Sequence, residues 1–238
     1  KMKRHYNPQS ATRYPCWWEE IVRASKDRDY PLGLLRHSHL GFYGQLRDWV
    51  GTQNLSYMFF DEPLLVHEML DFVADFIIEV SKRALLSVEA DYFEFFEDFA
   101  YKTGPLISPK IFKEFLMPRY KRVIEHFRKH GIRHFVLDSC GSPEVLIPLL
   151  IECGITSTYP LEQAAGMDPA KLRKEYGKDL TFGGGIDKRA LTKDKKAIEK
   201  ELLTKIPGLL EEGGYFPYLD HAFPPDISYQ NFLYYMKL

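Results

Sequence analysis

Short apolar segments alternate with longer amphipathic ones along this 238-residue chain. The long segments carry apolar residues at the spacing of a helix face, and several begin at proline or a capping residue and end at glycine. The short segments are apolar and rich in aromatic or β-branched residues, as buried strands are. The pattern predicts helices over 62–87, 108–131, 142–153, 168–176, 194–212 and 228–238, and strands over 30–37, 90–100, 134–138, 155–162, 180–187 and 215–223.

This alternation predicts an α/β fold, because parallel strands need crossover connections that are usually helices. Six strands can be counted, whereas a closed (β/α)₈ TIM barrel has eight. We therefore expect a single barrel domain over residues 1–238 that lacks its N-terminal strand or strands in this chain. An open, doubly wound sheet is the alternative. The glycine cluster at 182–187 does not have the pattern of a dinucleotide-binding loop or a P-loop.

Composition narrows the class of protein. The 32 basic and 33 acidic residues nearly cancel, so neither a nucleic-acid partner nor a polybasic membrane patch is expected. No apolar run reaches the length of a membrane span, and the start of the chain lacks the apolar core of a signal peptide. The three cysteines form no disulfide framework. We expect a reduced, cytoplasmic protein with one sizeable core.

Side chains capable of chemistry follow most of the predicted strands. In a barrel the carboxyl ends of the strands and the loops after them build the active site. A solvated rim of charges is the simpler alternative for each of them. The residues are His37, His39, Glu97, Asp98, Asp138, Cys140, Glu162, Asp187, Asp220 and His221.

The segment "DSCG" is the most suggestive of these strand ends. Asp138 and Cys140 are two residues apart, so on an extended strand both face one side and can reach one ion. Zinc accepts thiolate, imidazole and carboxylate ligands. The alternative is that Asp138 caps the next helix and Cys140 only packs. Likewise, His221 could be a turn histidine, Glu162 an ion-pair partner and His37 a core histidine.

Five segments, taken together, resemble the uroporphyrinogen decarboxylase superfamily. The resemblance covers about residues 45–238 and implies a (β/α)₈ barrel whose usual chain is longer at the N-terminus. The segments are "EDFAYKTGPLISPKIFKEFLMPRYKRV", "DSCG", "YPLEQAAGMD", "FGGGIDKRAL" and "GGYFPYLDHAFPPDISYQNFLYYM".

The resemblance extends to a zinc motif of the cobamide-dependent methyltransferases in this superfamily. Those enzymes carry HxCG at the fifth strand and a cysteine near the C-terminus. Here Asp138 stands at the histidine position, Cys140 and Gly141 match, and His221 falls at the later cysteine. Glu162 lies where a further ligand is plausible. The resemblance thus implies zinc held by Asp138, Cys140, Glu162 and His221.

The implied reaction is exchange of a methyl group between a small-molecule donor or acceptor and a corrinoid carried on a partner protein. Glu97, Asp98 and His37 are the candidates for handling protons. A homodimer is also implied. Two alternatives stay open: a decarboxylase of a porphyrinogen or other acidic substrate, with Arg36 or Arg47 pointing inward, and a non-catalytic barrel that binds a tetrapyrrole.

Overall fold

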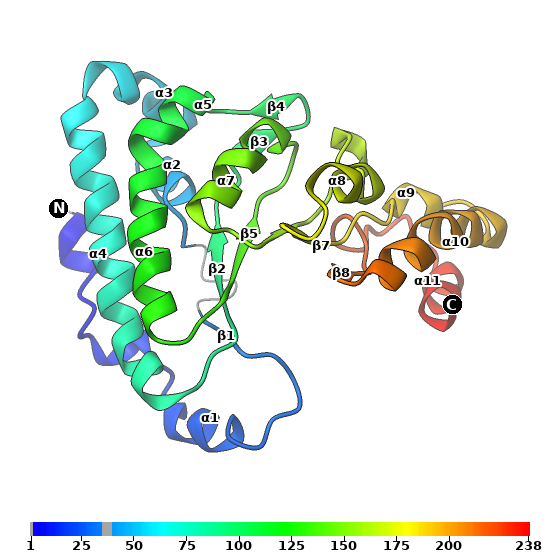
Figure 1. Ribbon diagram of the computed structural model, residues 1–238, viewed down its shortest axis with the longest axis horizontal. Coiled ribbons are helices and arrows are strands. Elements are labelled where there is room, and N and C mark those ends of the chain that lie inside the picture. Colours follow the sequence, from blue (N-terminus) through cyan, green and yellow to red (C-terminus); the bar gives the residue numbers. More distant parts are fainter. Residues whose placement is uncertain (1, 35–39) are drawn as a thin grey trace. The chain divides into compact units, whose positions relative to one another are not determined.

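The computed structural model describes residues 2–34 and 40–238 and shows an α/β fold (Figure 1). Its main sheet has six strands in the order β1-β2-β5-β6-β7-β8, and β1 runs parallel to β2, β6 to β7 and β7 to β8. The predicted α/β class and parallel sheet are confirmed, and closure into a barrel stays a prediction. The strands are β1 (Gly33–Leu34), β2 (Tyr92–Phe96), β5 (His134–Asp138), β6 (Ser157–Tyr159), β7 (Thr181–Gly183) and β8 (Tyr215–Phe216).

The helices connect these strands, and most follow the predicted pattern. The helical periodicity did not predict α1, α2, α3 or α9. The helices are α1 (Trp18–Ala24), α2 (Tyr43–Val50), α3 (Thr52–Asp61), α4 (Pro63–Ser87), α5 (Pro109–Ile111), α6 (Met117–Lys129), α7 (Ile147–Cys153), α8 (Pro169–Tyr176), α9 (Lys188–Leu191), α10 (Lys195–Glu212) and α11 (Tyr229–Lys237).

The strand predicted over 90–100 was too long. It ends at Phe96, because Asp98 adopts a left-handed backbone conformation with φ of 45°. Such a conformation breaks the extended chain and is uncommon for a residue other than glycine. The chain then forms an antiparallel hairpin of β3 (Ala100–Tyr101) and β4 (Gly104–Pro105).

The helix predicted over 108–131 is interrupted as its proline suggested. Ser108 caps its start by accepting a hydrogen bond from the Ile111 amide. A π-helical turn over Phe112–Leu116 then separates α5 from α6. Pro118 has no amide hydrogen for the carbonyl four residues earlier, so the regular α-helical ladder cannot continue through this point.

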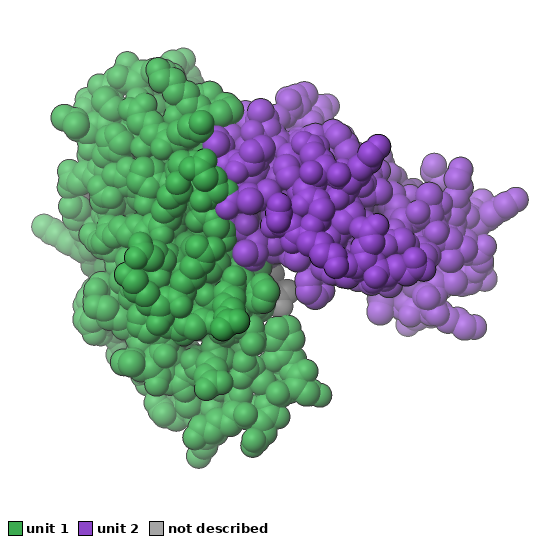
Figure 2. Space-filling view, viewed as in Figure 1, with its two compact units in different colours: residues 1–97, 107–136, 152–154 green, residues 98–106, 137–151, 155–238 purple. Residues whose placement is uncertain are grey.

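Two compact units make up the chain (Figure 2). In the first, α4 and α6 pack side by side (Figure 1). Buried aromatic side chains such as Phe93 and Phe127 stack in its core. The single domain expected over residues 1–238 stays a prediction. The first unit comprises residues 1–97, 107–136 and 152–154, and the second comprises 98–106, 137–151 and 155–238.

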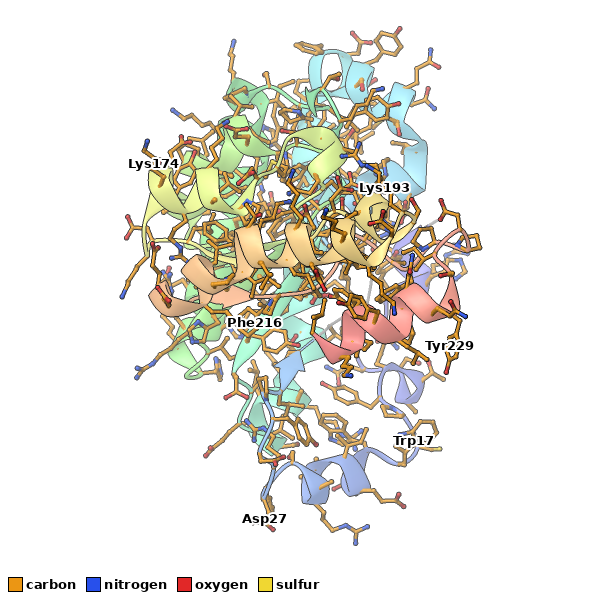
Figure 3. The ribbon with its side chains drawn as sticks, turned by 90° about the vertical axis from the view of Figure 1, so that its right-hand side faces the viewer. Trp17, Asp27, Lys174, Lys193, Phe216 and Tyr229 are labelled. Atoms are coloured by element: carbon orange, nitrogen blue, oxygen red, sulfur yellow. The ribbon has the colours of Figure 1, made fainter. Side chains whose placement is uncertain are left out.

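The second unit has two apolar clusters that hold its loops. One gathers buried side chains around Leu161 and Phe182, and the other gathers them around Ile186 and Leu219. Figure 3 looks onto α10 and α11, which contact each other in this unit and carry exposed side chains such as Tyr229. In the described ranges, no helix has both the length and the apolar character that a membrane span requires.

Candidate metal centre

Cys140, Glu162 and His221 come together in the second unit. One potential ligand atom from each, a thiol sulfur, a carboxylate oxygen and an imidazole nitrogen, lies within 4.8 Å of the other two. The three residues follow β5, β6 and β8 respectively. The carboxyl ends of parallel strands meet at one edge of a sheet, so residues 22 and 59 positions apart in the sequence can share one site.

The turn after Cys140 depends on glycine. Gly141 has a φ of 79°, and a Cβ atom built there would lie 2.7 Å from the carbonyl carbon of Ala100. The hairpin therefore packs directly against the turn, and the Ser142 amide donates to the carbonyl oxygen of Tyr101 at 3.0 Å. A side chain at position 141 would push the thiol away from this place.

Asp98 also fixes the position of Cys140. The amide of Cys140 donates a 2.9 Å hydrogen bond to Oδ1 of Asp98, and the Cys140 thiol is also hydrogen-bonded to this carboxylate. Asp98, one of the three residues predicted to handle protons, therefore lies against the cluster. Its proton-transfer role stays a prediction.

Glu162 is tied to the same turn. The amide of Gly141 donates to Oε2 of Glu162 at 2.7 Å. A carboxylate has two oxygens, so one can accept from this amide while the other is offered to a metal. Glu162 is half-buried and His221 is exposed, so the cluster opens to solvent on its histidine side.

The cluster carries an excess of negative charge around a half-buried thiol. Burial, together with the nearby carboxylates of Asp98, Glu162 and Asp138, raises the pKa of the Cys140 thiol to about 12. The thiol is thus protonated at neutral pH. A bound divalent cation would lower the pKa of the thiol, because its charge favours the thiolate and the carboxylates together.

The donor set fits zinc. Thiolate, imidazole and carboxylate are the ligands that zinc takes, at about 2.0 to 2.3 Å, which places neighbouring tetrahedral ligand atoms about 3.5 Å apart. The 4.8 Å limit within which the three atoms lie leaves only a small side-chain adjustment. Three protein ligands also leave the fourth zinc position open, as in catalytic sites.

Asp138, the fourth predicted ligand, is not a member of this three-residue group. It is the last residue of β5 and is 9% exposed. The prediction assumed that the extended chain continues through Cys140, but the strand ends at Asp138. Asp138 lies near enough to raise the pKa of Cys140, and its role as a ligand stays a prediction.

Glu97 is fully buried in the first unit. Its carboxylate accepts from the amides of Phe42 at 2.7 Å and Gly44 at 3.0 Å, and from the hydroxyl of Tyr120. Burial raises the pKa of Glu97, and these hydrogen bonds oppose the rise. The contacts favour a role in fixing the start of α2, and the predicted proton-handling role stays a prediction.

Other predicted strand-end residues have mixed outcomes. His37 and His39, as well as Arg36, lie outside the described residues. Asp187 caps α9 by accepting from the Arg189 amide, which is the simpler of the two interpretations of that position.

The contribution of the β3–β4 hairpin to the site was not predicted from the sequence. The signal for it was the polar "YKTG" turn inside an otherwise apolar segment.

The fold of this chain is similar to that of a solved structure. A methyltransferase from Methanosarcina mazei has a similar structure, with a TM-score of 0.66 and 19% sequence identity. The match covers 92% of this chain and 60% of that one, so this chain spans about three fifths of its length. At this identity the likeness shows the fold alone. The search of curated proteins gave no match.

A sequence model of the family described as uroporphyrinogen decarboxylase (URO-D) matches residues 48–238, which is more than half of the chain. The matched range contains Cys140, Glu162 and His221, and all the strands predicted from residue 90 onward. The chain therefore belongs to the uroporphyrinogen decarboxylase (URO-D) family.

Proposed function

We propose that this protein is a zinc-dependent methyltransferase of the URO-D family. The observation that carries the proposal is the convergence of Cys140, Glu162 and His221 within 4.8 Å. A catalytic zinc site needs three such ligands and an open position. This ligand set favours methyl transfer over decarboxylation, and a protein named as a methyltransferase has a similar fold.

Zinc bound here would act as a Lewis acid that lowers the pKa of a thiol or hydroxyl group of a substrate. Cys140, Glu162 and His221 would hold it. Asp98 and the Gly141 turn orient Cys140, and the Gly141 amide orients Glu162. Because His221 is exposed, the open side of the cluster can admit a substrate from solvent.

The remaining parts of the proposal extend the resemblance to the cobamide-dependent methyltransferases. The six-stranded sheet is proposed to be the larger part of a (β/α)₈ barrel. The methyl group is proposed to pass between a small-molecule donor or acceptor and a corrinoid on a partner protein. A homodimer and a cytoplasmic location complete the proposal.

Measurement of zinc binding tests the proposed function. Wild-type protein and the single variants Cys140→Ser, Glu162→Gln and His221→Gln would be stripped of metal and titrated with zinc in a calorimeter. We expect one zinc per chain for the wild type and at least a tenfold loss of affinity for each variant, because each loses one ligand. Cys16→Ser, which alters an exposed cysteine of the first unit that is not a member of the cluster, is the matched control and should bind like the wild type.

Absence of zinc binding by folded wild-type protein would contradict the proposal. Equal binding by the wild type and all three ligand variants would also contradict it. In either case the URO-D assignment would stand, and turnover of a porphyrinogen would be the next activity to measure.

A further inference from the structure

Asp220 is a buried carboxylate directly before His221. It lies in the loop after β8 and is 1% exposed. A carboxylate so completely removed from water needs hydrogen-bond donors around it. Its donors come from the loops after two other strands, which makes it a junction between segments far apart in the sequence.

The contacts of Asp220 join three loops. Its Oδ2 accepts from the amide of Gln163 at 3.0 Å, after β6. Its Oδ1 accepts from the amide of Lys188 at 3.3 Å, after β7, with the Lys188 ammonium 3.7 Å away. Its own amide donates to the carbonyl oxygen of Ile186 at 2.8 Å.

Gln163 is the residue after Glu162, and it is fixed through its side chain too. Its Oε1 accepts from the ammonium of Lys205 at 2.7 Å, and its Nε2 donates to the carbonyl oxygen of Met167 at 2.6 Å. Lys205 also donates to the carbonyl oxygen of Gly185 at 3.1 Å. The residue next to Glu162 is therefore held both by the hydrogen bond of its backbone amide to Asp220 and by the hydrogen bonds of its side chain.

We infer that Asp220 is a positioning residue that sets the Glu162 carboxylate relative to the His221 imidazole. The inference rests on the proposed function, since it takes these two side chains as metal ligands. Asp220 is bonded to the residue after one ligand and precedes the other, so a single side chain fixes both. A carboxylate suits the place, because it only accepts hydrogen bonds and two backbone amides point at it.

The test measures cobalt(II) binding by the stripped full chain, followed by its visible and near-ultraviolet absorption. In the Asp220→Asn variant an NH₂ group replaces one of the two carboxylate oxygens. One of the two backbone amides that donate to Asp220 therefore loses its acceptor. We expect about tenfold weaker cobalt binding. The thiolate-to-cobalt band should persist, because Asp98 and the hairpin hold Cys140, while the ligand-field bands should change as Glu162 and His221 move.

Two further variants keep the result decisive. Asp220→Ser retains a short acceptor and replaces the Asn variant if that one does not fold. Asp194→Ala removes the cap of α10, where the Asp194 carboxylate accepts from the Ala197 amide, and so lowers stability without removing any hydrogen bond of Asp220. It should keep wild-type affinity and spectrum.

Wild-type affinity and an unchanged spectrum in a folded Asp220 variant would overturn the inference while leaving the proposed function intact. Equal losses in the Asp220 and Asp194 variants would also overturn it, because they would show general destabilisation. No cobalt or zinc binding by the wild type would overturn the proposed function itself, and this inference with it.

Discussion

The amide of Gly141 donates a 2.7 Å hydrogen bond to the carboxylate of Glu162, so the turn that carries the thiol of the candidate site also holds its carboxylate. Two loops from neighbouring strands are thereby fixed to one another before any metal arrives. A site arranged in advance binds its ion with less loss of conformational entropy.

Replacement of Gly141 by alanine should damage both stability and metal binding. The new Cβ would sit in a left-handed backbone conformation and 2.7 Å from the carbonyl carbon of Ala100. We expect a loss of about 2 to 4 kcal/mol in the free energy of unfolding, measured in urea, from the strained backbone and the collision together.

Gly166 provides the matched control for this prediction. It has the same φ of 79°, but nothing lies within 4 Å of the Cβ that alanine would add. Gly166→Ala should therefore lose only about 1 kcal/mol, for the backbone conformation alone. Equal losses in the two variants would show that the hairpin does not press on the turn.

Much of this site was predictable from the sequence, for a definite reason. Residues at the carboxyl ends of parallel strands share one edge of the sheet, so Cys140, Glu162 and His221 were among the strand-end candidates. The resemblance to the cobamide-dependent methyltransferases then singled them out as ligands. Asp138 was included on the assumption that β5 runs on through Cys140, and the strand ends before it. The hairpin was not foreseen, because it depends on the left-handed conformation of Asp98, which the apolar pattern of 90–100 does not reveal.

Loss of the Tyr120 hydroxyl should destabilise the protein increasingly as the pH rises. In the fold, burial raises the pKa of Glu97, so the contribution of Glu97 to stability is greatest below its unfolded pKa and falls as pH rises through its folded pKa. The ionised carboxylate then depends most on the Tyr120 donor. We expect the loss for Tyr120→Phe, measured by urea unfolding, to grow from about 1 kcal/mol at the acidic end of the pH range in which the protein is folded to about 3 kcal/mol at the basic end.

Tyr215→Phe is the control for that experiment. The Tyr215 hydroxyl is also buried, but it donates to the carbonyl oxygen of Gly184 at 2.8 Å, a group that does not titrate. Loss of this hydroxyl should cost about 1 kcal/mol at both ends of the pH range. A penalty for Tyr120→Phe that does not change with pH would show that Glu97 keeps one protonation state throughout.

Metal affinity should rise with pH in a way that identifies Cys140. Burial and the neighbouring carboxylates raise the pKa of its thiol to about 12, so a metal that binds the thiolate must displace a proton. Between about pH 7.5 and 8.5, where ordinary carboxylates and imidazoles no longer titrate, we expect about a tenfold gain in cobalt affinity. Calorimetry in two buffers of different ionisation enthalpy would count the proton.

Cys140→Asp offers the comparison for the pH experiment. Its carboxylate is already ionised in this range, so binding should be weaker but nearly independent of pH. An equally steep rise in that variant would assign the released proton to a different group.

The most direct measurement is X-ray absorption at the zinc edge of the zinc-loaded protein. We expect one zinc per chain with a single sulfur ligand at about 2.3 Å and the remaining ligands, nitrogen or oxygen, at about 2.0 to 2.2 Å. The sulfur should disappear in Cys140→Ser and stay in Cys16→Ser. A zinc environment without sulfur, or with sulfur that survives the Cys140→Ser change, would contradict the claim that Cys140, Glu162 and His221 form the metal centre.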